Sequence, residues 1–101
     1  MNKYRAKPCL IGSVRFASQK EGKRFSELKL LEKAGEIHSL TLQPKFPIWI
    51  NGIKVFNYLA DYSYVVNDQR IIEDVKGVKT PMYRLKKKCV EAYYGIKITE
   101  T

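Results

Sequence analysis

Long hydrophobic runs are missing from this sequence of 101 residues. No apolar stretch approaches the roughly 18 residues that a membrane-spanning helix needs. Residues 1–7 are polar and basic, and no apolar segment follows them, so a secretory signal is not expected. We therefore expect a protein that has no membrane partner and is located in the cytoplasm.

Cysteine and histidine are also scarce. The two cysteines, Cys9 and Cys89, are far apart in the chain and do not have the spacing of metal ligands. They are typical of reduced thiols in a cytoplasmic protein. The single histidine, His38, falls at the start of an expected strand, where we expect it on the surface. The metal chemistry that the acidic residues suggest requires no histidine.

Acidic residues are few beside the basic ones. Nineteen lysines and arginines against ten acids give a net charge of +9 and a pI near 9.6. This excess favours a polyanionic partner, because each phosphate that Lys or Arg neutralises releases condensed counterions. Charge alone does not separate a DNA-processing role from solubility or an RNA-associated structural protein. The length and the hydrophobic fraction of 45% predict one globular domain over residues 1–101.

A first helix is predicted over residues 19–34. Ser18 and Glu21 have the spacing of a capping box, and Gly35 provides a stop. Its apolar stripe recurs at three-residue steps: Phe25, Leu28, Leu31 and Ala34. Upstream, residues 9–11 and 14–16 around Gly12-Ser13 predict a short hairpin.

The middle of the chain predicts three antiparallel strands. Two-residue turns at Asn51-Gly52 and Asn67-Asp68 separate them. Pro44 and Pro47 cannot donate to a ladder, so the first strand should be an edge strand or bulged. The strands are expected over residues 40–50, 54–66 and 69–76.

Thr80 and Pro81 open a second predicted helix, which Gly95 ends. Residues 96–98 follow as a last strand. The order αβββαβ predicts an α+β domain, a mixed sheet flanked by two helices. The expected buried stripe of the second helix is Met82, Leu85, Cys89, Ala92 and Tyr93, and the expected polar face is Arg84, Lys87, Lys88 and Glu91.

Strand register brings acidic residues together. If Val66 pairs with Gln69 across the second turn, extending the ladder sets Asp61 opposite Asp74. Carboxylates so placed repel unless a proton or a cation lies between them. Lys76 projects from the same face, two residues beyond Asp74.

The helical acid Glu21 points with the buried stripe and can join this group. Three carboxylates suit Mg²⁺ or Mn²⁺, which take oxygen ligands and keep waters and a substrate phosphate. The metal would lower the pKa of a bound water, and Lys76 would orient the water and offset phosphate charge.

The ordered set Glu21, Asp61 and Asp74-Val75-Lys76 resembles the PD-(D/E)XK nuclease superfamily, which has the restriction-endonuclease-like fold. The chain is also similar over residues 15–98 to a group of small phage and prophage proteins. The segments that carry this likeness are 16–21, 42–46, 58–62, 73–77 and 80–86. Phage Holliday-junction-resolving endonucleases share the same scheme. The resemblance implies metal-dependent phosphodiester hydrolysis, and it suggests branched or recombining DNA as the substrate.

Two positions depart from the superfamily pattern. Ala60 replaces the motif's proline, and Asp74 replaces the commoner glutamate. Glu73 is adjacent, but strand alternation points it to the other face. Gln43 resembles a family position and could bind the attacking water or the backbone, although Pro44 disturbs its register.

Each candidate also has a structural interpretation. Glu21 can serve only as a capping residue, and Asp74 with Lys76 can form a local ion pair. The expected DNA-binding residues can equally be a solvated helix face: Lys79, Arg84, Lys86, Lys87 and Lys88. A second basic group lies near the start of the chain: Lys3, Arg5, Lys7 and Arg15.

The favoured hypothesis is a Mg²⁺-dependent DNA endonuclease acting in phage replication, recombination or packaging. A small domain with one active site often pairs to cut two strands, so a homodimer is expected. A non-catalytic basic nucleic-acid-binding protein is the first alternative. A small protein that inhibits or redirects a host factor is the second.

Overall fold

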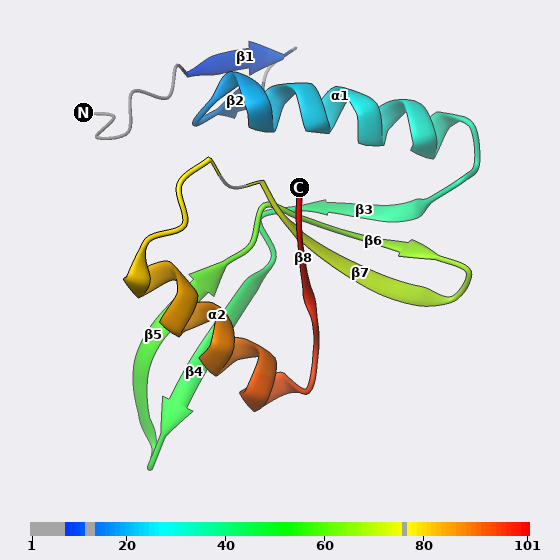
Figure 1. Ribbon diagram of the computed structural model, residues 1–101. Helices are drawn as coiled ribbons and strands as arrows, with labels where there is room; N and C mark the ends of the chain where they lie inside the picture. The colour runs from blue at the N-terminus through cyan, green and yellow to red at the C-terminus, as the bar shows by residue number, and fades with distance from the viewer. Residues whose placement is uncertain (1–7, 12–13, 76) are drawn as a thin grey trace.

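The computed structural model of the chain describes residues 8–11, 14–75 and 77–101 (Figure 1). Several sequence predictions fall outside these ranges: Lys3, Arg5, Lys7, the Gly12-Ser13 turn and Lys76. The flanks of that turn, β1 (Cys9–Ile11) and β2 (Val14–Phe16), form the predicted antiparallel hairpin.

Helix α1 (Gln19–Lys33) confirms the first predicted helix. Ser18 caps it, because its hydroxyl oxygen accepts a hydrogen bond from the Glu21 N–H at 3.2 Å. The helix lies beside the β1–β2 hairpin and over one face of the central sheet (Figure 1). Leu28 is its fully buried apolar residue, whereas Leu31 of the predicted stripe is exposed.

The first two long strands do not form as predicted, since each is bent into two. The segment 40–50 becomes β3 (His38–Leu42) and β4 (Lys45–Ile50), and 54–66 becomes β5 (Ile53–Leu59) and β6 (Tyr62–Val66). The two bends lie beside each other, and backbone hydrogen bonds join them. The Gln43 N–H donates to the Asp61 carbonyl at 2.9 Å, and the Ala60 N–H donates to the Pro44 carbonyl at 3.1 Å.

The bend divides the chain between two sheets. Strands β4 and β5 form a two-stranded sheet, with Asn51 and Gly52 at positive φ in the predicted turn. The other strands form a four-stranded sheet in the order β3-β6-β7-β8.

The four-stranded sheet confirms the predicted register. Strand β7 (Gln69–Asp74) pairs with β6 from Val66↔Gln69 to Tyr62↔Glu73. Strand β8 (Ile98–Glu100) begins two residues later than predicted and runs parallel to β7. Helices and mixed sheets together give the predicted α+β class.

Helix α2 (Pro81–Tyr94) has the predicted ends, with Thr80 as N-cap and Gly95 in the left-handed conformation. Its predicted buried face is wrong, because Met82, Leu85 and Tyr93 are more than half exposed. Polar contacts made to distant strands fix a different rotation of the helix. The Tyr83 hydroxyl donates to Glu100, Glu91 accepts from the Ile98 N–H, and the Tyr94 hydroxyl donates to the Pro47 carbonyl.

The buried residues form two cores on opposite faces of the four-stranded sheet. One lies under α1 and contains Phe16, Leu28, Ile37, Tyr62, Tyr64 and Val75. The other lies between α2, the β4–β5 hairpin and the sheet and contains Phe46, Ile48, Tyr58, Ala60, Ile72, Val90 and Ile98. Within the described residues, no helix is long and apolar enough to cross a membrane.

Candidate active site

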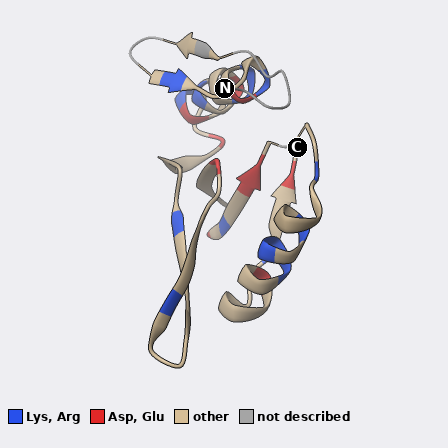
Figure 2. Ribbon diagram, turned by 90° about the vertical axis from the view of Figure 1, so that its left-hand side faces the viewer, with Lys and Arg blue, Asp and Glu red and all other residues tan. Residues whose placement is uncertain are grey.

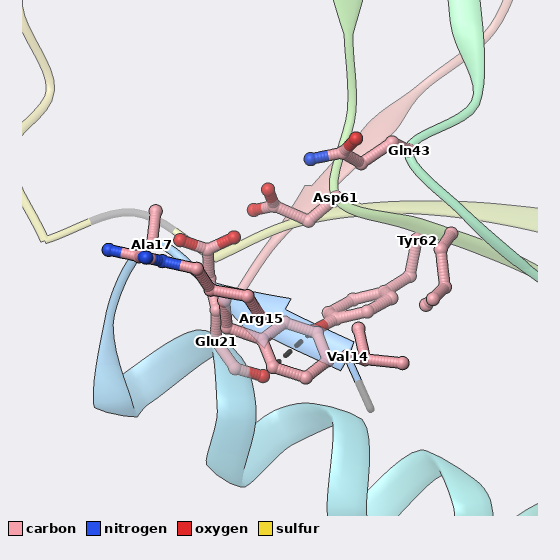
Figure 3. Close-up of a pocket in the computed structure, with 9 residues that line it drawn as sticks. Val14, Arg15, Ala17, Glu21, Gln43, Asp61 and Tyr62 are labelled. Atoms are coloured by element: carbon pink, nitrogen blue, oxygen red, sulfur yellow. Dashed lines mark hydrogen bonds between the residues drawn. The ribbon is translucent and has the colours of Figure 1, made fainter. Parts of the chain in front are cut away.

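Two of the predicted acids line one hollow at the junction of α1, β2 and the bend. Glu21 and Asp61 share a space of about 120 Å³ with Arg15, Gln43 and Tyr62. Figure 3 shows both carboxylates and the Gln43 amide turned toward this space, with the Arg15 guanidinium beside Glu21. The two acids, 40 positions apart in the chain, therefore face one small volume.

Asp61 lies in the bend, where the backbone fixes its side chain. One carboxylate oxygen accepts a hydrogen bond from the Val75 N–H at 2.6 Å. Its own N–H donates to the Glu73 carbonyl at 3.0 Å. The β6–β7 ladder ends at Tyr62↔Glu73, so the predicted Asp61–Asp74 pair lies just beyond its last recorded pair. Asp61 is thus held beside the end of β7.

Glu21 combines a capping position with a place in the hollow. Its carboxylate accepts a hydrogen bond from the Ser18 hydroxyl at 3.4 Å. Its carbonyl accepts one from the Tyr62 hydroxyl at 2.7 Å, which ties α1 to the sheet (Figure 3). Burial, together with the negative charges of Asp61 and Glu21, raises the pKa of Tyr62 above its usual range. Both carboxylates therefore act on the same phenol.

Gln43 reaches the hollow because its backbone turns there. Its φ of 50° is in the left-handed region, immediately before Pro44. This conformation ends β3 and brings the amide above Asp61 (Figure 3). The sequence had suggested Gln43 as an auxiliary residue, and the hollow contains it.

Asp74 is fully buried and does not line that hollow. It alternates with Glu73 and shares the face of Ile72, whose side chain belongs to the core beside α2. Burial, a hydrogen bond to Glu100 and the charges of Asp74, Glu100 and Asp61 raise the pKa of Tyr83. Asp74 therefore lies near Tyr83 of α2. Lys76, the predicted partner of Asp74, is outside the described residues.

Glu73 has a structural role on the opposite face, as strand alternation predicts. Its buried carboxylate receives two hydrogen bonds from Arg24, at 2.8 and 2.7 Å, and one from the Tyr64 hydroxyl. Burial by itself raises the pKa of Glu73, but the Arg24 and Tyr64 hydrogen bonds and the Arg24 charge outweigh it and leave the pKa lowered. The same contact joins α1 to β7.

Four of the five predicted DNA-binding residues share one shallow surface beside α2. Lys79, Arg84, Lys87 and Lys88 line it with Glu91 and Glu100. Figure 2 shows basic segments along α2 and acidic segments at the ends of the two strands beside it. The fifth residue, Lys86, lies 5.5 Å from the ring of Phe56 and faces the hairpin.

Glu100 is a site residue that the sequence did not reveal. It pairs with Asp74 across the parallel strands β7 and β8. A hydrogen bond from Tyr83 and the charges of Lys79 and Lys87 lower the pKa of Glu100, although partial burial opposes this. The parallel pairing of β8 depends on the path of α2, so no local pattern predicts it. Arg15, expected only as part of a basic group, also joins the hollow.

The oxygen atoms that line the hollow are of the kind that binds a hydrated divalent cation. In the described part of the chain, no group of three or more His, Cys, Asp or Glu residues lies close enough to hold a metal. Mg²⁺, however, is commonly bound through one or two carboxylates while keeping several waters. A volume of about 120 Å³ holds a few waters, since each takes about 30 Å³. Glu21 and Asp61 supply the matching carboxylate oxygens, and the Gln43 amide lies beside them.

A family model described as "Protein of unknown function (DUF1064)" matches residues 1–100 of the chain. Searches of curated proteins and of solved structures gave no match.

Proposed function

The chain belongs to the DUF1064 family, and we propose that it is a metal-dependent endonuclease that hydrolyses phosphodiester bonds in DNA. The observation that carries the proposal is the shared hollow of Glu21 and Asp61. Two carboxylates that share one small space favour a cation there, and Arg15, which lies beside Glu21, leaves Asp61 on the other side of the space. In a chain with a net charge of +9, such a site suits a cation and a polyanionic substrate together.

Glu21 and Asp61 would hold Mg²⁺ or Mn²⁺ in this role. When bound, the metal supplies a water of lowered pKa and stabilises charge on the reacting phosphate. The Val75 N–H holds one oxygen of Asp61 and so presets the orientation of the carboxylate. Gln43 would orient the attacking water, and Arg15 would neutralise phosphate charge at the rim.

Asp74 and Lys76 belong to the proposal through the resemblance to PD-(D/E)XK nucleases. That scheme gives the strand acid to the metal and the lysine to the attacking water. Asp74 lies near Tyr83, which also senses the charge of Asp61. Whether Asp74 itself contributes to the reaction is tested separately, with the variant Asp74→Asn.

The basic surface beside α2 would guide the DNA backbone. Lys79, Arg84, Lys87 and Lys88 present cations side by side, two of them partly neutralised by Glu100. Contacts of this kind position a duplex without reading bases. The resemblance further suggests branched DNA such as Holliday junctions, in phage recombination, replication or packaging, and a homodimer that cuts two strands.

A cleavage assay tests the activity. Plasmid, linear duplex and four-way-junction DNA are incubated with the protein and Mg²⁺, Mn²⁺ or EDTA. We expect cutting with either metal and none with EDTA. Replacing a single charged ligand usually lowers the rate by at least about a hundredfold, and we expect this of Asp61→Asn.

The matched control is Asp68→Asn, at an exposed turn position with φ 64° that asparagine tolerates. It should cut like the wild type. Asp74→Asn decides whether the buried acid takes part. Absence of cutting by the wild-type protein with both metals, on all three substrates, contradicts the enzyme proposal.

One observation favours a second function, a non-catalytic nucleic-acid-binding protein. The basic surface is lined by residues of α2 and its flanks and shares no lining residue with the hollow of Glu21 and Asp61. Binding could therefore persist without cleavage. Equal binding by wild-type protein and Asp61→Asn, with no cutting by either, supports this alternative.

A further inference from the structure

Several large apolar side chains are exposed on α2 and the β4–β5 hairpin, and five of them share one side of these elements. Each of these five has between 51% and 67% of its surface exposed. They are Ile50, Ile53, Met82, Leu85 and Tyr93, and we call them the apolar flank. Surface residues of this size are ordinary singly, whereas a contiguous set marks an interaction site.

The two parts of the apolar flank lie on one side of the molecule. Val90 marks the inward direction of α2, and the three flank residues of the helix lie roughly 60–140° around from it. Lys86 lies on the same side of the helix as Tyr93, and its ammonium is over the Phe56 ring of β5. The helical part of the flank therefore faces the side of β5, away from β8.

The hairpin part extends the same side. Ile48 and Phe56 face α2, and Ile50 and Ile53 return to that face beyond the bulge at Val55. The hairpin tip reaches past the helix (Figure 1). The apolar flank thus has one arm on the helix and one on the tip.

From these observations we propose that the apolar flank is the interface of a homodimer. Five half-exposed side chains of this size present on the order of 500 Å² of apolar surface, against about 800 Å² per partner in a standard interface with its polar rim. Under two-fold symmetry the helix arm of one copy packs on the hairpin arm of the other, and the reverse contact is identical. The apolar flank of one copy can therefore be covered completely by the same flank of a second copy.

The charge distribution also selects a second copy over nucleic acid. The flank contains no charged residue of its own, so it has no cation that could bind a phosphate. Two chains of net charge +9 repel each other, and this repulsion is least where their surfaces lack cations. Nearby Lys86 and Lys54 are held over the Phe56 and Trp49 rings, at 5.5 and 5.9 Å.

This interface leaves the candidate active site open. The hollow of Glu21 and Asp61 lies by α1, at the other end of the molecule from the hairpin tip (Figure 1). The inference depends on packing alone, and it is measured without DNA or metal. Failure of the nuclease proposal would not affect it, and a monomeric protein would remove only the homodimer from that proposal.

Sedimentation equilibrium over a concentration series tests the dimer. We expect a wild-type dimer, and at least about tenfold weaker association for Leu85→Glu and for Ile53→Glu, because each buries an unpaired charge. Both variants lower the net charge and so reduce general repulsion, which makes the expected change opposite to a charge effect. The matched control is Leu30→Glu on α1, 69% exposed and outside the flank, which should remain dimeric.

A second measurement leaves the flank residues unchanged. Cys89 lies on α2 between Leu85 and Tyr93, and a Cys9→Ser background makes it the single thiol. Its reaction with a maleimide should slow as protein concentration rises through the dimer range. A monomeric wild type, undiminished association of both flank variants, or a labelling rate independent of concentration would each overturn the proposal.

Discussion

Adjacent residues of β7 have opposite environments. Glu73 faces α1 and is bound by Arg24, whereas Asp74 faces α2 and lies near Tyr83. Both side chains are fully buried. Strand alternation alone separates a carboxylate that ties α1 to the sheet from one that faces the core beside α2.

The Arg24–Glu73 pair should contribute to stability in a pH-dependent way. Glu73→Gln removes the buried partner of Arg24 and leaves only its exposed pair with Glu27, and we expect a loss of about 3 kcal/mol in the free energy of unfolding at pH 7. Urea denaturation measures it. Glu32→Gln, at the exposed pair with Lys29, is the control and should change stability by less than about 0.5 kcal/mol.

The pH dependence follows from the direction of the pKa shift. The pKa of Glu73 is lowered in the folded state from its ordinary value of 4.5, so its contribution is complete above that value. As the pH falls below it, the unfolded state takes up the proton first, and the contribution is lost. Wild-type stability should therefore fall more steeply than that of Glu73→Gln between about pH 5 and pH 3. Parallel curves would contradict the assignment.

Among the elements, α2 shows the difference between local and long-range determinants. Its ends follow from Thr80, Pro81 and Gly95, all neighbours in sequence. Its rotation follows from contacts with β8 and β4, which no spacing in the helix records. The hydrophobic stripe predicted the wrong buried face because three of its residues, Met82, Leu85 and Tyr93, belong to the exposed apolar flank.

The C-terminal cap of α2 gives a prediction at this scale. Gly95 has φ 66°, where a Cβ is strained, and nothing lies within 4 Å of the added atom. Gly95→Ala should therefore lower stability by about 1 kcal/mol through backbone strain alone. Gly77→Ala, equally open but without a positive φ, is the control and should be nearly neutral in thermal melts. A neutral Gly95→Ala would show that the helix end relaxes.

The sequence predicted those parts of the fold and site that short-range chemistry determines. The turn at Asn67-Asp68 set the β6–β7 register, and the Ser18 cap set the position of Glu21. The bend at Gln43 and Asp61 escaped prediction because its two hydrogen bonds join residues 18 and 16 positions apart. That bend separates Asp61 from a ladder pairing with Asp74, which the extended register could not anticipate.

The whole molecule combines a net charge of +9 with a local cluster of cations beside α2. If this surface binds DNA, affinity should fall linearly on a plot of log binding constant against log salt concentration. Lys88→Ala should weaken binding to all sequences alike and reduce that slope by about 1. Fluorescence anisotropy with labelled duplexes at several salt concentrations measures both effects.

Lys29→Ala provides the control for this prediction. Lys29 is paired with Glu32 on α1 and is far from the basic surface in sequence. Lys29→Ala changes the net charge by the same amount as Lys88→Ala, but Lys29 does not line the basic surface. The salt-dependence slope of Lys29→Ala should therefore stay close to that of the wild type. Equal reductions in the two variants would indicate a general charge effect and no defined binding surface.

The contact between Arg24 and Glu73 also bears on how the chain reaches its fold. A one-residue slip of β7 would turn Asp74 toward α1 and Glu73 toward α2. Arg24 would then meet a shorter carboxylate, and the two-pronged contact and the Tyr64 hydrogen bond would both be lost. The buried ion pair therefore favours the observed strand alignment over a one-residue slip.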